Sequence, residues 1–292
     1  MASRRDPLIA ALPNLRDVGG HPTSDGARVR TGLLYRSTDL SRIDETDAKA
    51  LARLGIRTVY DLRTTAERTG QPDRLPPGSA YVVADILGDT PGMTPAAFAA
   101  LFEDPAAAKA SLGGGRAATF FVDSYREFVR LDCARAGYRR LFVDLAGGAT
   151  TPALFHCTTG KDRTGWAAAA LLLFLGVPDD AVMEDYLLSG PRLLPVVRPL
   201  VEAFAARGGD PELLWPLVGV QPEYLEAALD EVRGLFGSIE GYFADGLGID
   251  AQALVTLRAT LVARELTDRC AQAWRVSLRR RAGGPGRRAG SP

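Results

Sequence analysis

The sequence predicts an α/β fold in which a mostly parallel sheet is flanked by helices. Short β-rich runs, such as residues 56–62, 79–86 and 151–155, alternate with longer stretches of helical periodicity. The run at 151–155 leads through a short loop into an apolar stretch, 166–177, that has the length of a buried helix. Strands that alternate with helices are typical of parallel sheets, because parallel strands need crossover connections.

Composition excludes several classes of protein. The chain has 292 residues, of which 46% are hydrophobic and 24% are charged, as in an ordinary globular protein. The formal net charge is zero, so no overall basic field indicates a nucleic-acid partner. Three cysteines are an odd number and indicate a reducing compartment rather than a disulfide scaffold. With two histidines and no cysteine pair at zinc-ligand spacing, we expect neither a metal site nor a cofactor.

The N-terminus has no apolar run of secretory length, and no stretch approaches the roughly 18 apolar residues of a membrane span. We therefore expect a cytoplasmic protein without stable membrane insertion.

Residues 1–276 are expected to form a single domain, with 1–13 as a flexible lead-in. Residues 90–118 contain several prolines and alanines and the glycines 113–115, which predicts a helical insertion hinged at those glycines. Such an insertion is either an exposed linker or a mobile lid. Residues 277–292 are basic and rich in Gly and Pro, which predicts a disordered tail.

The other elements follow in order. Asp44 is placed to cap a helix that ends near Gly55, before the strand at 56–62. That strand ends in Asp61 and Arg63, and the carboxyl ends of parallel strands border the crevice where ligands bind. One long helix is expected from 119 to 146, and further helical patterns follow residue 178, with prolines at their boundaries.

The most informative stretch is residues 151–166, TPALFHCTTGKDRTGW. Cys157 ends the apolar run, and Arg163 follows after five residues at the start of the predicted helix. The backbone N–H groups of such a loop, together with the helix dipole, favour a bound anion. A helix N-terminus with nearby Arg or Lys stabilises thiolate over thiol. A thiolate beneath a site for a phosphate-sized anion indicates cysteine-dependent phosphoryl transfer.

The spacing alone is not specific, because the sequence repeats it by chance. Cys133 and Arg139 have the same separation, but they lie in a segment of helical periodicity with no preceding strand. Cys157 differs in its context, which consists of His156 before it, Gly160 in the loop and Thr164 after the arginine.

HCTTGKDRTG resembles the signature loop of protein tyrosine phosphatases, in the variant of the bacterial family of mycobacterial phosphatase B and the LipA-type tyrosine and lipid phosphatases. Three further motifs occur in the family order: NLRDVGG (14–20), LLYRSTDL (33–40) and DLRTTAE (61–67). The resemblance implies a protein-tyrosine-phosphatase-like fold with a helical lid at 90–118, whose inward face would include Phe98, Leu101 and Phe102. It also implies that signal-less export can occur.

The implied activity is hydrolysis of phosphotyrosine, with phosphoserine/threonine or phosphoinositides as further candidates, through a phosphocysteine intermediate. Cys157 would attack phosphorus, and Arg163 would grip two oxygens with its planar fork. Backbone N–H groups of the loop would hold the remaining oxygens. The expected phosphate-binding residues are Thr158, Thr159, Gly160, Lys161, Asp162 and Arg163.

Asp85 is the first choice for the general acid, because it ends a strand expected to neighbour the signature strand. Asp89 and Asp162 are the alternatives. Lys161 is expected at the rim, Thr164 is expected to hydrogen-bond the sulfur, and His156 to orient the loop. Other candidate supporting residues are Arg16, Asp17, Asp61 and Arg63, of which the first two could equally form a structural ion pair or turn.

Two other functions remain to be distinguished. A catalytically inactive phosphate-binding module is disfavoured by the intact Cys157, Arg163 and Thr164. A rhodanese-type sulfurtransferase also uses a loop cysteine, but the five-residue spacing and the KDRTG ending disfavour it. The expected partner is a phosphorylated protein or phospholipid substrate, and the sequence leaves the oligomeric state open.

Overall fold

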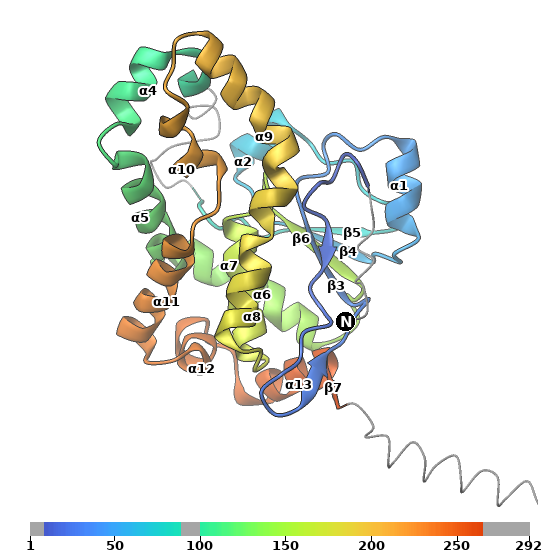
Figure 1. The fold of residues 1–292 in the computed structure, drawn as a ribbon. Coiled ribbons are helices and arrows are strands. Elements are labelled where there is room, and N and C mark those ends of the chain that lie inside the picture. Colours follow the sequence, from blue (N-terminus) through green and yellow to red (C-terminus); the bar gives the residue numbers. More distant parts are fainter. Residues whose placement is uncertain (1–8, 89–99, 265–292) are drawn as a thin grey trace, which may run out of the picture.

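The computed structural model describes residues 9–88 and 100–264. Its centre is a five-stranded sheet of order β1-β3-β6-β4-β5 (Figure 1). Strands β3, β6, β4 and β5 run parallel, and β1 at one edge is antiparallel to β3. The prediction of a mostly parallel sheet flanked by helices is therefore confirmed. The strands of this sheet are β1 (Arg16–Asp17), β3 (Leu34–Ser37), β4 (Thr58–Asp61), β5 (Ala80–Val83) and β6 (Ala153–His156).

A second sheet pairs a strand near the start of the described chain with the last strand. Strand β2 (Ala27–Val29) pairs antiparallel with β7 (Val262–Arg264). The helices are α1 (Glu45–Ala52), α2 (Thr65–Gly70), α4 (Pro105–Leu112), α5 (Arg116–Arg130), α6 (Asp132–Ala146), α7 (Arg163–Phe174), α8 (Asp179–Leu187), α9 (Ser189–Ala206), α10 (Trp215–Val218), α11 (Pro222–Phe236), α12 (Ile239–Gly241) and α13 (Ala251–Leu261). Short 3₁₀ and π segments are η1 (Pro211–Leu213) and η2 (Tyr242–Gly246).

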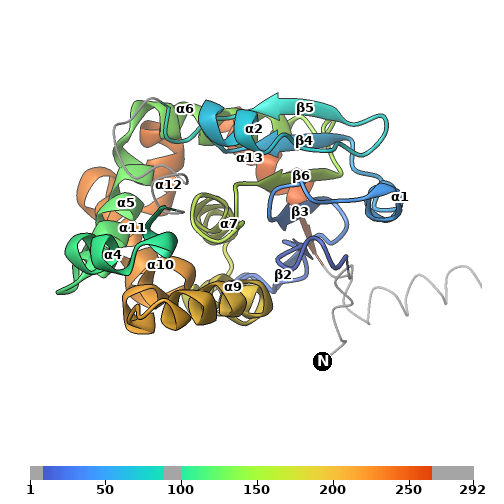
Figure 2. The ribbon, with the colours of Figure 1, turned by 90° about the horizontal axis from the view of Figure 1, so that it is seen from above.

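The main sheet separates two apolar cores. Along β6, Leu154 faces the smaller core with α1, whereas Ala153 and Phe155 face the larger core with α6 and α7. Figure 2 shows α7 between the sheet and the helices α5 and α11, with α1 at the opposite end of the molecule. Because both faces are covered, every residue of β6 is buried, as the continuous apolar run predicts.

Two sequence-based expectations about local structure were wrong. Ile9 and Leu12 are buried in the smaller core, so the described part of the expected flexible lead-in is packed. The expected single helix at 119–146 is two helices, α5 and α6, which are separated at Leu131 by an extended ψ of 135°. The apolar face of α5 packs against α11, whereas α6 packs against α13, so the chain turns between them.

The expected insertion at 90–118 is described from residue 100 onward. Within it, α4 is capped by Asp104 and packs against α5, and Leu101 and Phe102 are partly buried against the larger core. Asp89 and Phe98 lie outside the described residues, as does the expected tail at 277–292. Among the described helices, none combines the length and apolar character needed to cross a membrane.

Candidate active site

The candidate site lies where three parallel strands end. Ser37 of β3 and Asp61 of β4 are both in register with His156 of β6, so the three carboxyl ends are side by side. The loop 157–162 leaves β6 at this edge, and α7 begins directly after it with Arg163. This is the edge at which open α/β sheets bind ligands, and the loop expected to bind phosphate is therefore well placed to do so.

Gly160 is required by the shape of this loop. Its φ is +67°, a region that residues with a side chain rarely adopt. A Cβ atom at this position would lie 2.1 Å from the carbonyl oxygen of Ser37, which is far inside contact distance. The loop therefore approaches β3 as closely as it does only because residue 160 is glycine.

Donors outside the loop hold its carbonyl groups. The backbone N–H of Asp39 donates to the Thr158 oxygen at 3.1 Å. Asn14 donates to the Thr159 oxygen at 3.1 Å, and Arg36 to the Gly160 oxygen at 2.8 Å. Because a trans peptide points its C=O and N–H in opposite directions, the N–H groups that follow these carbonyls are turned into the loop. That orientation suits an anion.

Cys157 is 1% exposed and lies at the bottom of the loop, directly after β6. A ring nitrogen of His156, Nδ1, lies 3.1 Å from the Cys157 oxygen, which is consistent with a role in orienting the loop. The hydroxyl of Thr164 is buried and has no hydrogen-bond partner within residues 9–88 and 100–264. The expected bond from Thr164 to the Cys157 sulfur is therefore not formed in this structure.

Arg163 is held by Glu67 of α2. Its Nη1 and Nη2 atoms donate to the two Glu67 carboxylate oxygens at 2.7 and 2.6 Å. Burial would raise the pKa of Glu67, but the hydrogen bonds and charge of Arg163 lower it to about 2. Burial would lower the pKa of Arg163, but the hydrogen bonds with Glu67 raise it. Glu67 also accepts a hydrogen bond from the Thr158 hydroxyl, so it ties both ends of the loop to α2.

Asp61 and Arg63 belong to a buried network behind the loop. Arg63 Nη2 contacts Asp61 Oδ2 at 2.7 Å and Asp73 Oδ2 at 2.8 Å. His156 Nε2 lies 3.2 Å from the same Asp73 oxygen. Burial would lower the pKa of His156, but the interactions with Asp73 and Asp61 raise it. Asp61, Asp73 and His156 could offer three ligand atoms to a cation, and the guanidinium of Arg63 already bridges the two carboxylates.

Arg16 supports the loop through a second network, centred on Asp185 of α8. Arg16 Nε and Arg36 Nη1 each lie 3.2 Å from an oxygen of Asp185. Burial would raise the pKa of Asp185, but Arg16, His21 and Arg36 lower it. Asp185 thus orders Arg36, whose other nitrogen holds the Gly160 carbonyl.

Asp17 has a different role: its carboxylate accepts from the backbone N–H groups of Gly19 and Gly32 at 2.7 and 2.6 Å. It therefore organises the turns on either side of β2. Arg16 and Asp17 were each expected either to support the site or to form a structural ion pair or turn. Arg16 lies behind the loop, whereas Asp17 stabilises turns.

Lys161 and Asp162 form an adjacent ion pair. Lys161 is 3% exposed, so it is not at the rim as expected. Its Nζ atom lies 2.8 Å from Asp162 Oδ1 and 4.5 Å from the centre of the Phe121 ring. Tyr125 also donates to Asp162 Oδ1, at 3.2 Å. Asp162 retains 19% exposure of its side chain, so the carboxylate reaches solvent from the loop.

Asp85 is more distant in the sheet than expected. Strand β5, which precedes it, pairs with β4, and β4 lies between β5 and β6. The expectation that this strand neighbours the signature strand was therefore wrong. Asp85 Oδ1 accepts from the backbone N–H groups of Leu87 and Gly88, and Oδ2 lies 3.5 Å from Arg68 Nη1. Both oxygens therefore already have partners outside the signature loop.

The sequence pattern of the tyrosine phosphatase family matches residues 8–263. The chain belongs to this family. A provisionally named tyrosine-protein phosphatase of Cupriavidus necator is 32% identical over 252 residues, which cover 86% of this chain and 87% of that protein. The triple specificity protein phosphatase PtpB of Mycobacterium tuberculosis is 32% identical over 274 residues, which cover 85% of this chain and 96% of PtpB. A tyrosine-protein phosphatase of Nostoc commune is 28% identical over 250 residues, or 82% of this chain and 78% of that protein.

As a member of the tyrosine phosphatase family, the chain is a hydrolase that acts on phosphotyrosine, and its substrate is phosphorylated. The resemblance inferred from four short motifs is thus confirmed over most of the described chain.

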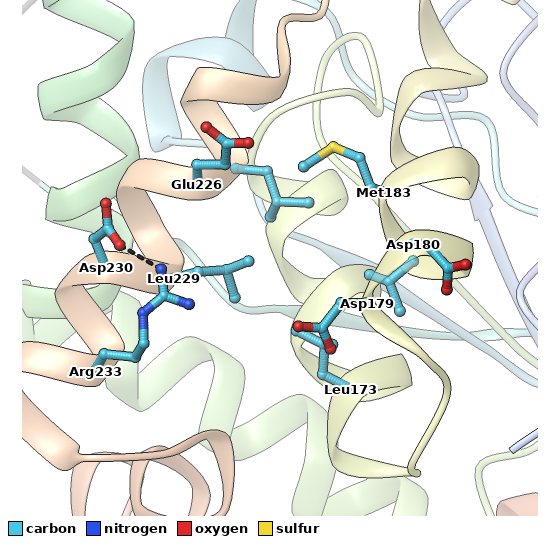
Figure 3. A pocket seen from close by; sticks show the side chains of 10 residues that line it. Leu173, Asp179, Asp180, Met183, Glu226, Leu229, Asp230 and Arg233 are labelled. Atoms are coloured by element: carbon cyan, nitrogen blue, oxygen red, sulfur yellow. Dashed lines mark hydrogen bonds and ion pairs between the residues drawn. The ribbon is translucent and has the colours of Figure 1, made fainter. Parts of the chain in front are cut away.

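A hollow of the phosphatase lies away from this loop, between α8 and α11 (Figure 3). It measures about 440 Å³, and none of the loop residues 157–163 lines it. Its charged lining consists of Asp179, Asp180, Glu226, Asp230 and Arg233. The arginine is paired with Asp230, so the carboxylates dominate and would repel a phosphate.

Sequence reasoning missed several residues that organise the phosphatase site: Arg36, Glu67, Asp73 and Asp185. Arg36 and Glu67 lie inside the motifs that resemble the phosphatase family, so the sequence did contain a sign that they belong to the site. Glu67 also ends the pattern Thr64-x-x-Glu67, which forms a capping box. The pattern explains Glu67 as a capping residue and does not indicate that Glu67 also holds Arg163. Asp73 and Asp185 belong to no motif, and only the folded structure brings them behind the loop.

Proposed function

We propose that this phosphatase works through a phosphocysteine on Cys157, with Arg163 holding the phosphoryl group. The observation that carries the proposal is the orientation of Arg163. Glu67 takes the edge of the guanidinium formed by Nη1 and Nη2. The edge formed by Nε and Nη2 carries no carboxylate in the described part of the chain, so it can bind two phosphoryl oxygens side by side.

In the first step, the Cys157 thiolate attacks phosphorus in line, an S–P bond forms and the P–O bond to the tyrosyl oxygen breaks. The departing phenolate takes a proton from a carboxylic acid. Arg163 and the inward N–H groups of the loop bind the three phosphoryl oxygens, which carry most of the charge in the transition state.

In the second step, a water molecule attacks phosphorus and gives its proton to the carboxylate left by the first step. The new P–O bond forms, the S–P bond breaks, and the thiolate leaves with its electron pair. Inorganic phosphate is released, and both the thiolate and the carboxylic acid are restored.

We assign the proton transfers to Asp162 in preference to Asp85. Asp162 belongs to the loop itself, its side chain reaches solvent, and its side-chain hydrogen bonds within the described residues all fall on Oδ1. Oδ2 is then the oxygen that carries the transferred proton. Both oxygens of Asp85 are engaged by its own turn and by Arg68.

For substrates, we propose phosphotyrosine as the preferred phosphoryl donor. The PtpB relative is named a triple specificity phosphatase, which makes phosphoserine, phosphothreonine and phosphoinositides the comparisons to include. A free positive charge on Lys161 would favour highly charged phosphoinositides. Its ammonium is buried and paired with Asp162, which weakens that argument.

The sequence supplies matched controls for a direct test. Cys157→Ser is expected to lower kcat for a phosphotyrosine peptide by about 10³-fold or more, whereas Cys133→Ser leaves it unchanged. Arg163→Lys is expected to cost roughly 10²-fold to 10³-fold, whereas Arg139→Lys has no effect. Cys133 and Arg139 have the same spacing as the catalytic pair but lie on α6.

Equal effects in the two pairs of variants would contradict the proposal. Thiosulfate should not be turned over by the wild-type chain; if it is, and phosphotyrosine is not, the loop serves sulfur transfer instead. Phosphotyrosine binding without any turnover would make the chain a phosphate-binding module.

A further inference from the structure

Helix α5 presents two aromatic residues, one helical turn apart, to the consecutive residues Lys161 and Asp162. The Phe121 ring lies 4.5 Å from Lys161 Nζ, a cation–π contact. Four residues later on the same face, the Tyr125 hydroxyl donates to Asp162 Oδ1 at 3.2 Å. One helix outside the signature loop therefore contacts two consecutive charged residues of the loop.

The Tyr125 hydroxyl is itself held by a second tyrosine. Tyr186 of α8 lies 2.7 Å away, oxygen to oxygen, and both side chains are fully buried. Burial, followed by the nearby Asp162 charge, raises the pKa of Tyr186, and burial, Tyr186 and Asp162 raise that of Tyr125. Both hydroxyls therefore keep their protons. Because each has one proton and Tyr125 gives its own to Asp162, Tyr186 must donate to Tyr125.

The aromatic surroundings keep α5 in place. Phe121 stacks on Tyr224 of α11 with ring centres 5.3 Å apart, and Tyr125 lies 5.8 Å from the same ring. Tyr224 donates its own hydroxyl proton to the Pro216 carbonyl at 3.0 Å rather than to Asp162. Packing thus fixes the position of Tyr125, and its hydroxyl donates to Asp162 from a fixed place.

Asp162 Oδ1 accordingly accepts from two fixed donors, Tyr125 and Lys161. A carboxylate held by one oxygen has its rotation about χ2 restricted, and its other oxygen points in a defined direction. We propose that Tyr125, supported by Tyr186, is a positioning residue that orients the Asp162 carboxylate so that Oδ2 exchanges protons with the leaving group and with water. This inference rests on the assignment of Asp162 in the proposed function.

The dependence on the leaving group separates positioning from a general structural effect. Phenyl phosphate releases a basic phenolate and needs the acid, whereas 4-nitrophenyl phosphate releases a stable anion and does not. Tyr125→Phe removes one oxygen atom and retains the ring packing. We expect kcat/KM, which covers only the steps up to departure of the phenol, to fall about tenfold for phenyl phosphate and to stay within about twofold for 4-nitrophenyl phosphate.

Tyr224→Phe is the matched control, because it removes from the same aromatic cluster a hydroxyl that donates to Pro216 and not to Asp162. It should leave both substrates unaffected. Tyr186→Phe should show the same selectivity as Tyr125→Phe at smaller size, since it acts through Tyr125. In an Asp162→Asn background, Tyr125→Phe should cause no further loss, because the two residues act as one unit.

Equal losses on both substrates, no loss on either, or a full tenfold loss that persists in the Asp162→Asn background would each overturn the role of Tyr125. The failure of the underlying assignment is distinguishable. If Asp162→Asn itself turns over phenyl phosphate at the wild-type rate, then Asp162 is not the acid. If Asp162→Asn is selectively impaired on phenyl phosphate and Tyr125→Phe is not, only the inference about Tyr125 fails.

Discussion

At the scale of single residues, the site depends on carboxylates that hold arginines. Glu67 fixes Arg163, and Asp185 fixes Arg16 and Arg36. An arginine side chain has many rotamers, and a phosphate that had to order it would lose affinity. These carboxylates order the guanidinium groups before substrate arrives.

Glu67→Gln tests this preorganisation. Glutamine has nearly the same shape, but it lacks the charge and one of the two acceptors for Arg163. We expect KM for a phosphotyrosine peptide to rise about tenfold, and the free energy of unfolding to fall by about 3 kcal/mol, because breaking a buried ion pair leaves the partner uncompensated. Steady-state kinetics and urea unfolding measure the two quantities.

The control for this variant is Glu45→Gln, which changes an exposed glutamate in the first turn of α1. It should change neither quantity measurably. A Glu67→Gln enzyme with normal KM would show that Arg163 orders itself without Glu67.

At the scale of elements, the sequence predicted what local pattern controls. The strand at 153–156, the loop and the buried helix α7 could be predicted because apolar runs, Gly160 and the charged loop all lie within one short segment. The alternation of burial along β6, with Leu154 on one face and Phe155 on the other, is the expected consequence of strand geometry.

The sequence failed where partners are distant along the chain. The continuous helical period across α5 and α6 gave no sign of the turn at Leu131, because the turn arises from two different packing partners, α11 and α13. The order of strands β4, β5 and β6 likewise depends on tertiary pairing, so Asp85 was placed one strand too near. The sequence did not indicate Tyr125 as a site residue, because a tyrosine on the apolar face of a helix usually packs in the core.

At the scale of the whole molecule, buried charged networks link the phosphatase site to stability. The pKa of Glu67 is about 2 in the folded chain against an ordinary 4.5. A lowered pKa contributes stability that is fully present above pH 4.5 and is lost as the pH falls through 2. Asp61 and Asp185 also have lowered pKa values, so they act in the same direction.

His156 acts in the opposite direction. Its pKa is raised above the ordinary 6.5, so its contribution is fully present below pH 6.5 and is lost as the pH rises through the folded value. We therefore expect stability to decline on both sides of mildly acidic pH. Urea unfolding midpoints measured across pH test this, and Glu67→Gln should show a shallower decline between pH 4.5 and 2 than the wild type. An identical acid limb in the two proteins would contradict the role given to Glu67.

The covalent intermediate is the central claim, and a rapid-quench experiment tests it most directly. Wild-type and Asp162→Asn chains are mixed with 4-nitrophenyl phosphate, quenched in acid and digested, and the peptides are mapped by mass spectrometry. The account predicts a phosphate on the sulfur of Cys157, with more of it in Asp162→Asn because water attack is slowed. Phosphate release without any phosphate on Cys157 in either chain, or with phosphate on a different residue, would contradict it.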